Sequence, residues 1–231
     1  MKKHLYKYNG HGKTTVTVAG CGGTGSQMLI SLARMDLALR NLGGEGLSVT
    51  AYDPDTVSSA NAGRQSFYSC DIGRNKAEVL AERLRLCFPA FEITGIGKPF
   101  VKDSLFGQFL ITCVDSREAR RKIFAARRSN YHMDCGNGAN HGQVILGNGQ
   151  DLPWPEEVLP ELTAKGREDN TPSCSMAEAL EKQDLFVNDF AVRIASAILW
   201  DLFRHGGTDI RGAFYSLDPI RVNPIQIQNK R

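Results

Sequence analysis

The sequence predicts a single α/β domain with a mainly parallel sheet, helices on both faces and an antiparallel extension at its C-terminal end. Three patterns support this. An apolar strand over residues 14–20 runs into the turn Gly20-x-Gly22-x-x-Gly25, a second strand ends at Asp53, and amphipathic helices alternate with short apolar runs thereafter. A strand, a glycine turn, a helix and a strand ending in an acid form a Rossmann-like nucleotide-binding unit.

The first half of the chain gives clear elements. Helical spacing of apolar residues follows Gly25, and residues 47–52 form the second strand. Residues 53–72 lack periodicity and are rich in small polar residues, which is typical of a functional loop. A helix over residues 75–86 ends before Pro89, and strands over residues 91–96 and 105–114 follow.

Ser116 is the expected cap of a helix that carries the densest run of basic residues, which we interpret as a solvated face. Residues 131–135 and 143–146 read as strands joined by a flexible glycine-rich connection. Composition shifts at residue 147, and residues 147–172 are expected to form a long crossover or mobile loop. The widest apolar stripe lies in the helix over residues 186–203, and a hairpin over residues 212–227 closes the fold.

Bulk properties fit a globular protein of 231 residues in one domain, with an N-terminal arm over residues 1–13. The net charge of +3 is too small to indicate binding to nucleic acid or to an anionic membrane, and no apolar run suggests a membrane span. The six cysteines form no Cys-x-x-Cys pair, so we expect a reducing cytoplasm, no disulfide framework and no zinc site.

The glycine turn carries the first chemical signal. Backbone N–H groups of Gly20, Gly22, Gly23 and Gly25 at a helix N-terminus favour a phosphate. An acid after the second strand can accept hydrogen bonds from ribose hydroxyls, and Asp53 is the candidate. Asp55 is an alternative, although an acid at that position is also a common turn residue.

Two cations follow the second strand. Nothing in the surrounding loop explains Arg64, and Lys76 falls in the first turn of a helix, where the dipole disfavours positive charge. Each alone is typical of a surface residue, but together they suggest a polyphosphate clamp. Asp115 ends the fourth strand, where a carboxylate near a triphosphate would hold Mg²⁺; the competing interpretation is a helix N-terminal acid.

Cys174 is the best nucleophile candidate among the cysteines. It precedes a helix, and a helix N-terminus raises the thiolate content of a cysteine. An incidental cysteine explains the local sequence equally well.

These residues, in this order, resemble the family of adenylating proteins that includes ThiF, MoeB and the ubiquitin-activating enzymes. The glycine turn is followed by Asn61-x-x-Arg64-Gln65, by Lys76 after Asp-Ile-Gly and by Cys-Val-Asp115. The Asn-x-x-Arg-Gln element is specific, because ordinary NAD-binding folds lack it. The match spans roughly residues 14–204 and looks closest to the short ThiF-like proteins of bacterial operons called PRTRC.

The resemblance implies an enzyme that uses ATP and Mg²⁺ to adenylate the C-terminal glycine of a small ubiquitin-like protein. It implies that Asp53 holds the ribose, that Asn61, Arg64 and Lys76 bind phosphates, and that Asp115 coordinates Mg²⁺. Gln65 belongs to the same element. In a member that goes beyond adenylation, Cys174 would then take the acyl group as a thioester or take part in sulfur transfer. A conjugating-enzyme-like partner and a homodimer, with the helix over residues 186–203 near its interface, are also implied.

Two departures limit the resemblance. The zinc-binding cysteine pairs of many members are absent, and residues 1–14 hold lysines but no arginine to reach a second subunit's ATP. Two other functions remain open from the sequence. The glycine turn and Asp53 also fit an NAD-binding oxidoreductase, although no catalytic Tyr-x-x-x-Lys pair stands out, and a non-catalytic scaffold would retain the fold but lose the cations.

Overall fold

The computed structural model describes residues 3–6, 12–63, 65–104, 106–166 and 175–227. Their core is an eight-stranded sheet in the order β10-β9-β7-β6-β5-β2-β3-β4. Its parallel half is built from β2 (Thr14–Ala19), β3 (Leu47–Tyr52), β4 (Glu92–Ile96), β5 (Phe109–Thr112) and β6 (Tyr131–Asn137). Its antiparallel half is built from β7 (His141–Gly147), β9 (Ile210–Leu217) and β10 (Ile220–Gln226).

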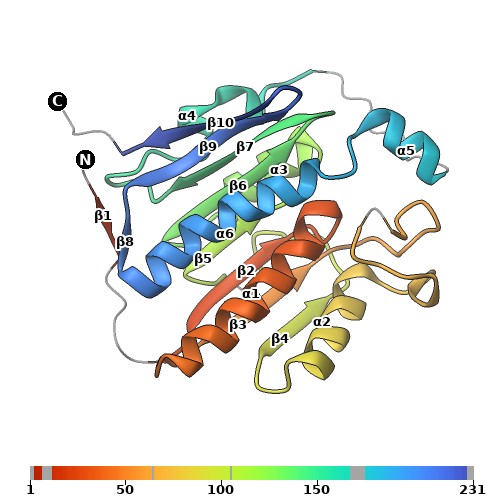
Figure 1. Cartoon of the computed structure of the whole chain (residues 1–231), viewed down its shortest axis with the longest axis horizontal. Coiled ribbons are helices and arrows are strands. Elements are labelled where there is room, and N and C mark those ends of the chain that lie inside the picture. The colour runs from red at the N-terminus through yellow and green to blue at the C-terminus, as the bar shows by residue number, and fades with distance from the viewer. Residues whose placement is uncertain (1–2, 7–11, 64, 105, 167–174, 228–231) are drawn as a thin grey trace.

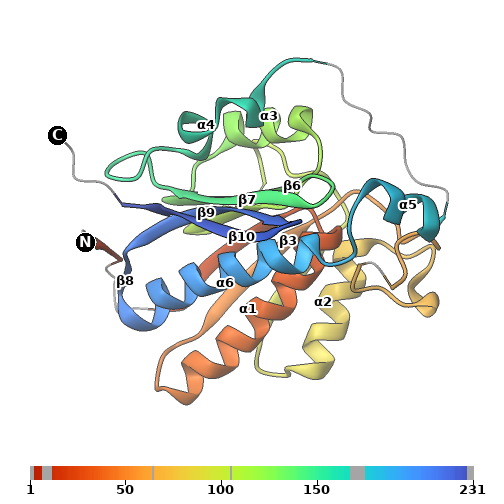
Figure 2. The same ribbon diagram turned by 45° about the horizontal axis from the view of Figure 1, so that its top comes forward.

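Helices cover both faces of the sheet, as Figures 1 and 2 show. One face carries α1 (Gly23–Asn41), α2 (Lys76–Cys87) and α6 (Val187–His205). The other carries α3 (Arg117–Ala126) and the short helices α4 (Pro155–Val158) and η2 (Pro160–Thr163). The 3-10 turn η1 (Ser69–Asp71) and α5 (Met176–Lys182) lie at one end of the molecule. The predicted Rossmann-like α/β architecture is confirmed.

The antiparallel extension begins earlier in the chain than the sequence predicted. Glycine-rich residues 136–142 were expected to be a flexible connection, but most of them belong to the β6–β7 hairpin, whose turn is closed by the Gly138 N–H donating to the His141 carbonyl (2.8 Å). Glycine permits close strand pairing as well as flexibility, so composition alone did not distinguish the two. The hairpin reverses the sheet direction beside the carboxyl ends of the parallel strands.

The apolar stripe of α6 is core. Its side chains that pack on the sheet and on α1 are fully buried: Val187, Ala191, Val192, Ala195, Ile198, Leu199 and Leu202. The helix ends at Gly206, whose left-handed φ of 66° suits glycine at this position. Among the described residues, no helix is both long and apolar enough to cross a membrane.

The basic run around α3 is only partly the solvated face that we expected: Lys122 and Arg128 are exposed, but three arginines have partners elsewhere in the fold. Arg120 is buried against Asp134 of β6, Arg121 donates to the carbonyl of Ala164, and Arg127 pairs with Glu156 while lying over the Trp154 ring. These arginines attach α3 to the sheet and to the predicted crossover. Their partners come from other parts of the chain, which a charge count along one helix does not reveal.

A second, two-stranded sheet joins the described part of the N-terminal arm to the segment after α6. In the N-terminal arm, β1 (His4–Leu5) pairs with β8 (Gly207–Thr208), and buried His4 lies between the Asp151 carboxylate (2.7 Å) and the Tyr131 hydroxyl (2.9 Å). At the sheet's outer edge, β10 exposes Ile220 and Val222 to solvent.

Candidate functional site

A cleft of about 580 Å³ opens at the carboxyl ends of the parallel strands. Residues from both halves of the described chain line it. They come from the glycine turn, the turn after β3, the start of α2, the end of β5, the β6–β7 hairpin, the C-terminal end of α5 and the start of α6. The predicted site residues that line it are Gly20, Gly22, Gly23, Asp53, Asp55, Gln65, Lys76 and Asp115. Ligands bind at this edge in open α/β sheets.

Each motif glycine has its own steric reason. Gly20 has a φ of 93°, which L side chains rarely adopt. A Cβ at Gly25 would lie 1.8 Å from the Gly20 carbonyl oxygen, so α1 approaches β2 too closely for any side chain. A Cβ at Gly22 would meet no atom within 4 Å, because Gly22 faces the open cleft. The turn therefore leaves room for a ligand beside the N-terminus of α1.

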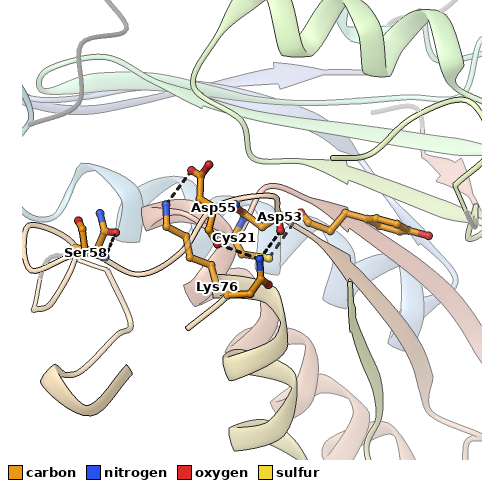
Figure 3. Close-up of polar contacts among 8 residues, drawn as sticks. Cys21, Asp53, Asp55, Ser58 and Lys76 are labelled. Atoms are coloured by element: carbon orange, nitrogen blue, oxygen red, sulfur yellow. Dashed lines mark hydrogen bonds and ion pairs between the residues drawn. The ribbon is translucent and has the colours of Figure 1, made fainter. Parts of the chain in front are cut away.

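Asp53 organises the glycine turn from beneath. Its buried carboxylate accepts hydrogen bonds from the backbone N–H groups of Cys21 (2.6 Å) and Asp55 (2.8 Å), as Figure 3 shows for Cys21. Burial raises the pKa of Asp53, while these hydrogen bonds and nearby Lys76 oppose that shift. The carboxylate retains acceptor capacity for a ribose hydroxyl, since its oxygens offer about four lone-pair sites.

Lys76 begins α2 with its side chain in the cleft. Its Nζ donates to the Asp55 carboxylate at 3.1 Å, and Figure 3 shows the two side chains meeting across the turn. Asn75 caps α2 through the Glu78 N–H and also donates to the carbonyls of Asp53 and Asp55. The lysine is buried whereas Asp55 is largely exposed, so a phosphate in the cleft could compete for the same ammonium.

The residues of the Asn-x-x-Arg-Gln element do not all lie at the cleft. Gln65 is buried against the cleft, and no donor among the described residues reaches its Oε1. Such an unpaired buried acceptor is what a hydroxyl-bearing ligand could satisfy. Asn61 does not line the cleft; its side chain accepts from the Ser58 N–H (3.0 Å) in a turn. Arg64 lies outside the described residues.

The loop that carries this element is attached to α2 by Arg83. The guanidinium donates to the Ser66 carbonyl (2.8 Å), pairs with the Asp71 carboxylate and lies over the Tyr68 ring. Burial alone would raise the pKa of Asp71, but the Tyr68 N–H and the Arg83 side chain lower it overall. Sequence reasoning missed Arg83, which looked like one more charge on an amphipathic helix.

Asp115 follows β5 and is exposed to the cleft. Its carboxylate makes no hydrogen bond or ion pair with the described residues, whereas its backbone carbonyl is reached by Arg120. No group of three or more His, Cys, Asp and Glu side chains able to hold a metal occurs in the described ranges. Mg²⁺ is commonly bound by one or two carboxylates together with substrate phosphates, and a single free carboxylate suits that mode.

A ring of amide side chains forms the opposite wall of the cleft. Asn188 of α6 accepts from the Thr24 hydroxyl (2.9 Å) and the Asn137 amide (2.8 Å), and it donates to Gln183 (3.1 Å). Gln183, which ends α5, donates to Asn137 at 2.9 Å. We call these four residues the amide ring. No sequence signal identified it, because its members come from four distant segments.

The cysteines also differ in their relation to the cleft. Cys174, the predicted nucleophile, lies outside the described residues. Cys113 and Cys135 line the cleft from neighbouring strands and are buried, and the adjacent Cys113 together with burial raises the pKa of Cys135 well above its ordinary value. A thiol held in that protonated state is a poor nucleophile.

Beneath the cleft, His132 is a buried neutral imidazole. The Arg127 guanidinium donates to its Nδ1 (3.1 Å), so Nε2 carries the proton and donates to the Thr112 hydroxyl (2.8 Å). Burial, followed by the charges of Arg127 and Arg120, lowers the pKa of His132 well below its usual range. The pairing fixes β6 against β5 and α3 rather than presenting a base to the cleft.

Comparison with known proteins identifies the family to which this chain is similar. The model of the ThiF family matches residues 9–231. The tRNA threonylcarbamoyladenosine dehydratase of Escherichia coli is 28% identical over 160 residues, covering 66% of this chain and 56% of that protein. Human ubiquitin-like modifier-activating enzyme 7 is 32% identical over 114 residues, covering 48% of this chain and 11% of that protein. The chain thus spans about half of the bacterial relative and far less of the human one.

Solved structures show the same fold. Escherichia coli MccB crystallised with ATP superposes with a TM-score of 0.63 at 16% sequence identity, covering 94% of this chain and 64% of MccB. At that identity the likeness establishes the fold alone.

Proposed function

The chain belongs to the ThiF family, and from that premise we propose that it binds ATP in the cleft and adenylates the C-terminal glycine of a small ubiquitin-like protein. The observation that carries the proposal is one juxtaposition. The open glycine turn, the buried acceptor of Gln65, the ammonium of Lys76 and the carboxylate of Asp115, which pairs with none of the described residues, meet in a single cleft. An NAD-binding enzyme has no use for a lysine and a free carboxylate at the phosphate end.

In this proposal the α1 N-terminus and the glycine turn hold the phosphates by backbone N–H groups, and Gly22 leaves the space that they need. Asp53 fixes the turn and accepts from the ribose. The carboxylate of the partner attacks the α-phosphorus, a new acyl–phosphate bond forms, and the bond to the β-phosphate oxygen breaks to release pyrophosphate. Lys76 leaves Asp55 to stabilise charge on the phosphates, so the chemistry is mainly positioning and neutralisation.

Asp115 is the proposed Mg²⁺ ligand. The ion would neutralise charge on the phosphates as they separate. The protein's own contribution is to keep one carboxylate free of other partners at the end of β5, while Arg120 is engaged by Asp134 and does not neutralise it.

Three further roles are proposed from the family resemblance. Arg64 and Asn61 bind phosphates, which for Asn61 requires its turn to move toward the cleft, since its amide now holds Ser58. Cys174 accepts the acyl group as a thioester after adenylation, with AMP as the leaving group. The activated protein then passes to a conjugating-enzyme-like partner in a bacterial pathway of the PRTRC type.

We also propose that the active form is a homodimer in the cytoplasm. Sedimentation equilibrium of the purified chain tests the dimer directly. A monomer at all concentrations would rule out a site shared between subunits.

The decisive experiment is calorimetric titration with ATP, with and without Mg²⁺, and with NAD⁺. We expect ATP binding that weakens at least about tenfold in Lys76→Ala, the loss of one charge-assisted contact. The matched control is Lys98→Ala, which removes an exposed lysine outside the cleft. Preference for NAD⁺ would overturn the proposal.

Catalysis is then tested by ATP–pyrophosphate exchange with a candidate ubiquitin-like protein that ends in glycine. The same protein lacking its terminal glycine is the substrate control. Asp115→Asn should slow exchange strongly, whereas Asp103→Asn, an exposed acid elsewhere, should not. Cys174→Ala should leave exchange intact and abolish the thioester.

A further inference from the structure

The C-terminal end of α5 forms part of the cleft. Ala179, Lys182 and Gln183 line it together with the β6–β7 turn. The helix is held there by Gln183, whose amide donates to Asn137 Oδ1 (2.9 Å), and by the Asp184 N–H, which donates to the Ala139 carbonyl (2.7 Å). This short helix therefore has a defined place beside the cleft.

The amide ring also identifies which end of the cleft α5 reaches. Gln183 contacts Asn137 and Asn188, and both of these contact Thr24 in the first turn of α1. The first turn of α1 is where backbone N–H groups would receive phosphates. Asp53 approaches the cleft from the end of β3 and contacts Cys21 of the glycine turn. Lys182, directly before Gln183, lines the cleft on the wall that contacts the first turn of α1.

Charge in the cleft is unbalanced without Lys182. The described lining residues include three carboxylates, those of Asp53, Asp55 and Asp115. They include two lysines, Lys76 and Lys182, and no arginine. A triphosphate adds several negative charges, and Lys76 is already paired with Asp55. One lysine is a weak match for that load, even with a magnesium ion at Asp115.

The ion pair of Lys182 with Glu178 does not prevent such a role. Its Nζ lies 3.2 Å from Glu178 one turn earlier, and both side chains are more than a third exposed. Exposed pairs of this spacing contribute little, because solvent screens them and the side chains lose freedom. A phosphate is a stronger acceptor for the ammonium than this carboxylate.

We propose that Lys182 is a phosphate-binding residue of the nucleotide site, which binds the β- and γ-phosphates of ATP from the α5 wall. The inference rests on the proposed function and extends it by one residue. Lys182 would then be a second cation of the same chain, facing the phosphates from the wall opposite Lys76. The α5 wall then contributes charge as well as shape to the site.

The test is equilibrium titration of the full chain with ATP and, separately, with AMP, both with Mg²⁺. The variants are Lys182→Gln, Lys182→Arg and the control Lys122→Gln. Lys122 on α3 forms the same one-turn pair with Glu118 and is exposed away from the cleft, so its substitution matches the lost helix pair. We expect ATP to bind about five- to tenfold more weakly to Lys182→Gln, with AMP affinity unchanged. Lys182→Arg should recover most of the difference, and Lys122→Gln should behave as wild type.

Three results would overturn the inference. If Lys182→Gln binds ATP as wild type does, the residue does not touch phosphate and the proposed function stands. If ATP and AMP weaken equally, α5 acts by shaping the cleft alone. If wild-type protein binds neither nucleotide, the proposed function fails and this inference fails with it.

Discussion

The two walls of the cleft are built by different means. On one wall, β2, α1 and β3 are fixed by steric limits: Gly25 lies against backbone, and Asp53 holds the turn from below. On the other wall, α5 and the start of α6 are joined by the side-chain hydrogen bonds of the amide ring and by one backbone bond, from the Asp184 N–H to the Ala139 carbonyl. Steric limits leave one arrangement, whereas hydrogen bonds between side chains can exchange partners with water or ligand. The first wall is therefore the rigid one and the second the adjustable one.

The largest expected loss of stability comes from a substitution that disrupts the rigid wall. Gly25→Ala places a Cβ into the Gly20 carbonyl, and α1 must separate from β2 to admit it. We expect the free energy of unfolding to fall by at least about 3 kcal/mol, measured by urea denaturation.

Gly22→Ala is the matched control in the same turn. Its Cβ meets no protein atom within 4 Å, so stability should change by less than about 1 kcal/mol. Because the added methyl occupies the cleft, ATP affinity should still fall. Equal destabilisation by both substitutions would contradict the steric account.

A substitution in the adjustable wall should lower the free energy of unfolding by less. Asn188→Ala leaves the Thr24 hydroxyl and the Asn137 amide without their buried acceptor. We expect a loss of about 2 kcal/mol in the free energy of unfolding. Asp189→Ala, one residue along and with a single part-buried bond to Gln27, should cost under about 1 kcal/mol. A cost for Asn188→Ala as large as that for Gly25→Ala would abolish the distinction between the walls.

Gln183→Ala sharpens the comparison by acting locally. It frees the C-terminal end of α5 from Asn137 without touching α1 directly. We expect amide hydrogen exchange in α5 to accelerate by about tenfold, the equivalent of one hydrogen bond, while exchange in α1 is unchanged. Glu181→Ala, exposed on the same helix, is the control. Equal acceleration in α1 and α5 would mean that the walls open as one unit.

The smallest expected effect is the loss of stability at acidic pH that His132 causes. His132 of β6 packs against Phe124 of α3, and burial lowers its pKa in the folded protein. Below the unfolded value of about 6.5, the unfolded chain gains a proton that the folded chain does not, so stability falls as pH falls. The loss from this residue should be about 1 kcal/mol between about pH 6.5 and about pH 5.5. Denaturation of His132→Gln should lack this slope, whereas exposed His141→Gln should retain it.

The rigid wall is also the wall that the sequence reveals. Gly20, Gly22 and Gly25 at fixed spacing, with Asp53 after the next strand, specify a turn whose parts are local in the chain. Lys76 and Asp115 could also be placed from the sequence. Lys76 begins the helix α2 and Asp115 follows the strand β5, and both positions lie where the parallel strands end. Five parallel strands and the closing hairpin were predictable for the same reason: each has its own apolar run.

The adjustable wall could not be predicted. Thr24 and Asn188 are separated by 164 positions, and neither asparagine nor glutamine has a periodic pattern that would pair them. The arginines of α3 were misread because their partners Asp134 and Glu156 belong to other elements. Polar contacts between distant segments become visible only when the fold has brought them together.

The outer strand of the sheet has a consequence for how the protein behaves in concentrated solution. Among the described residues, no strand pairs with the outer side of β10, and its apolar side chains make it the kind of edge on which a second sheet can add and start aggregation. Pro224 interrupts that edge, since a proline has no N–H to offer an incoming strand and fits a ladder where its nitrogen faces outward. The register shift between Ile225 and Gln226 twists the edge further. Together they leave only a short stretch of β10 available, which favours a chain that stays dispersed during synthesis and storage.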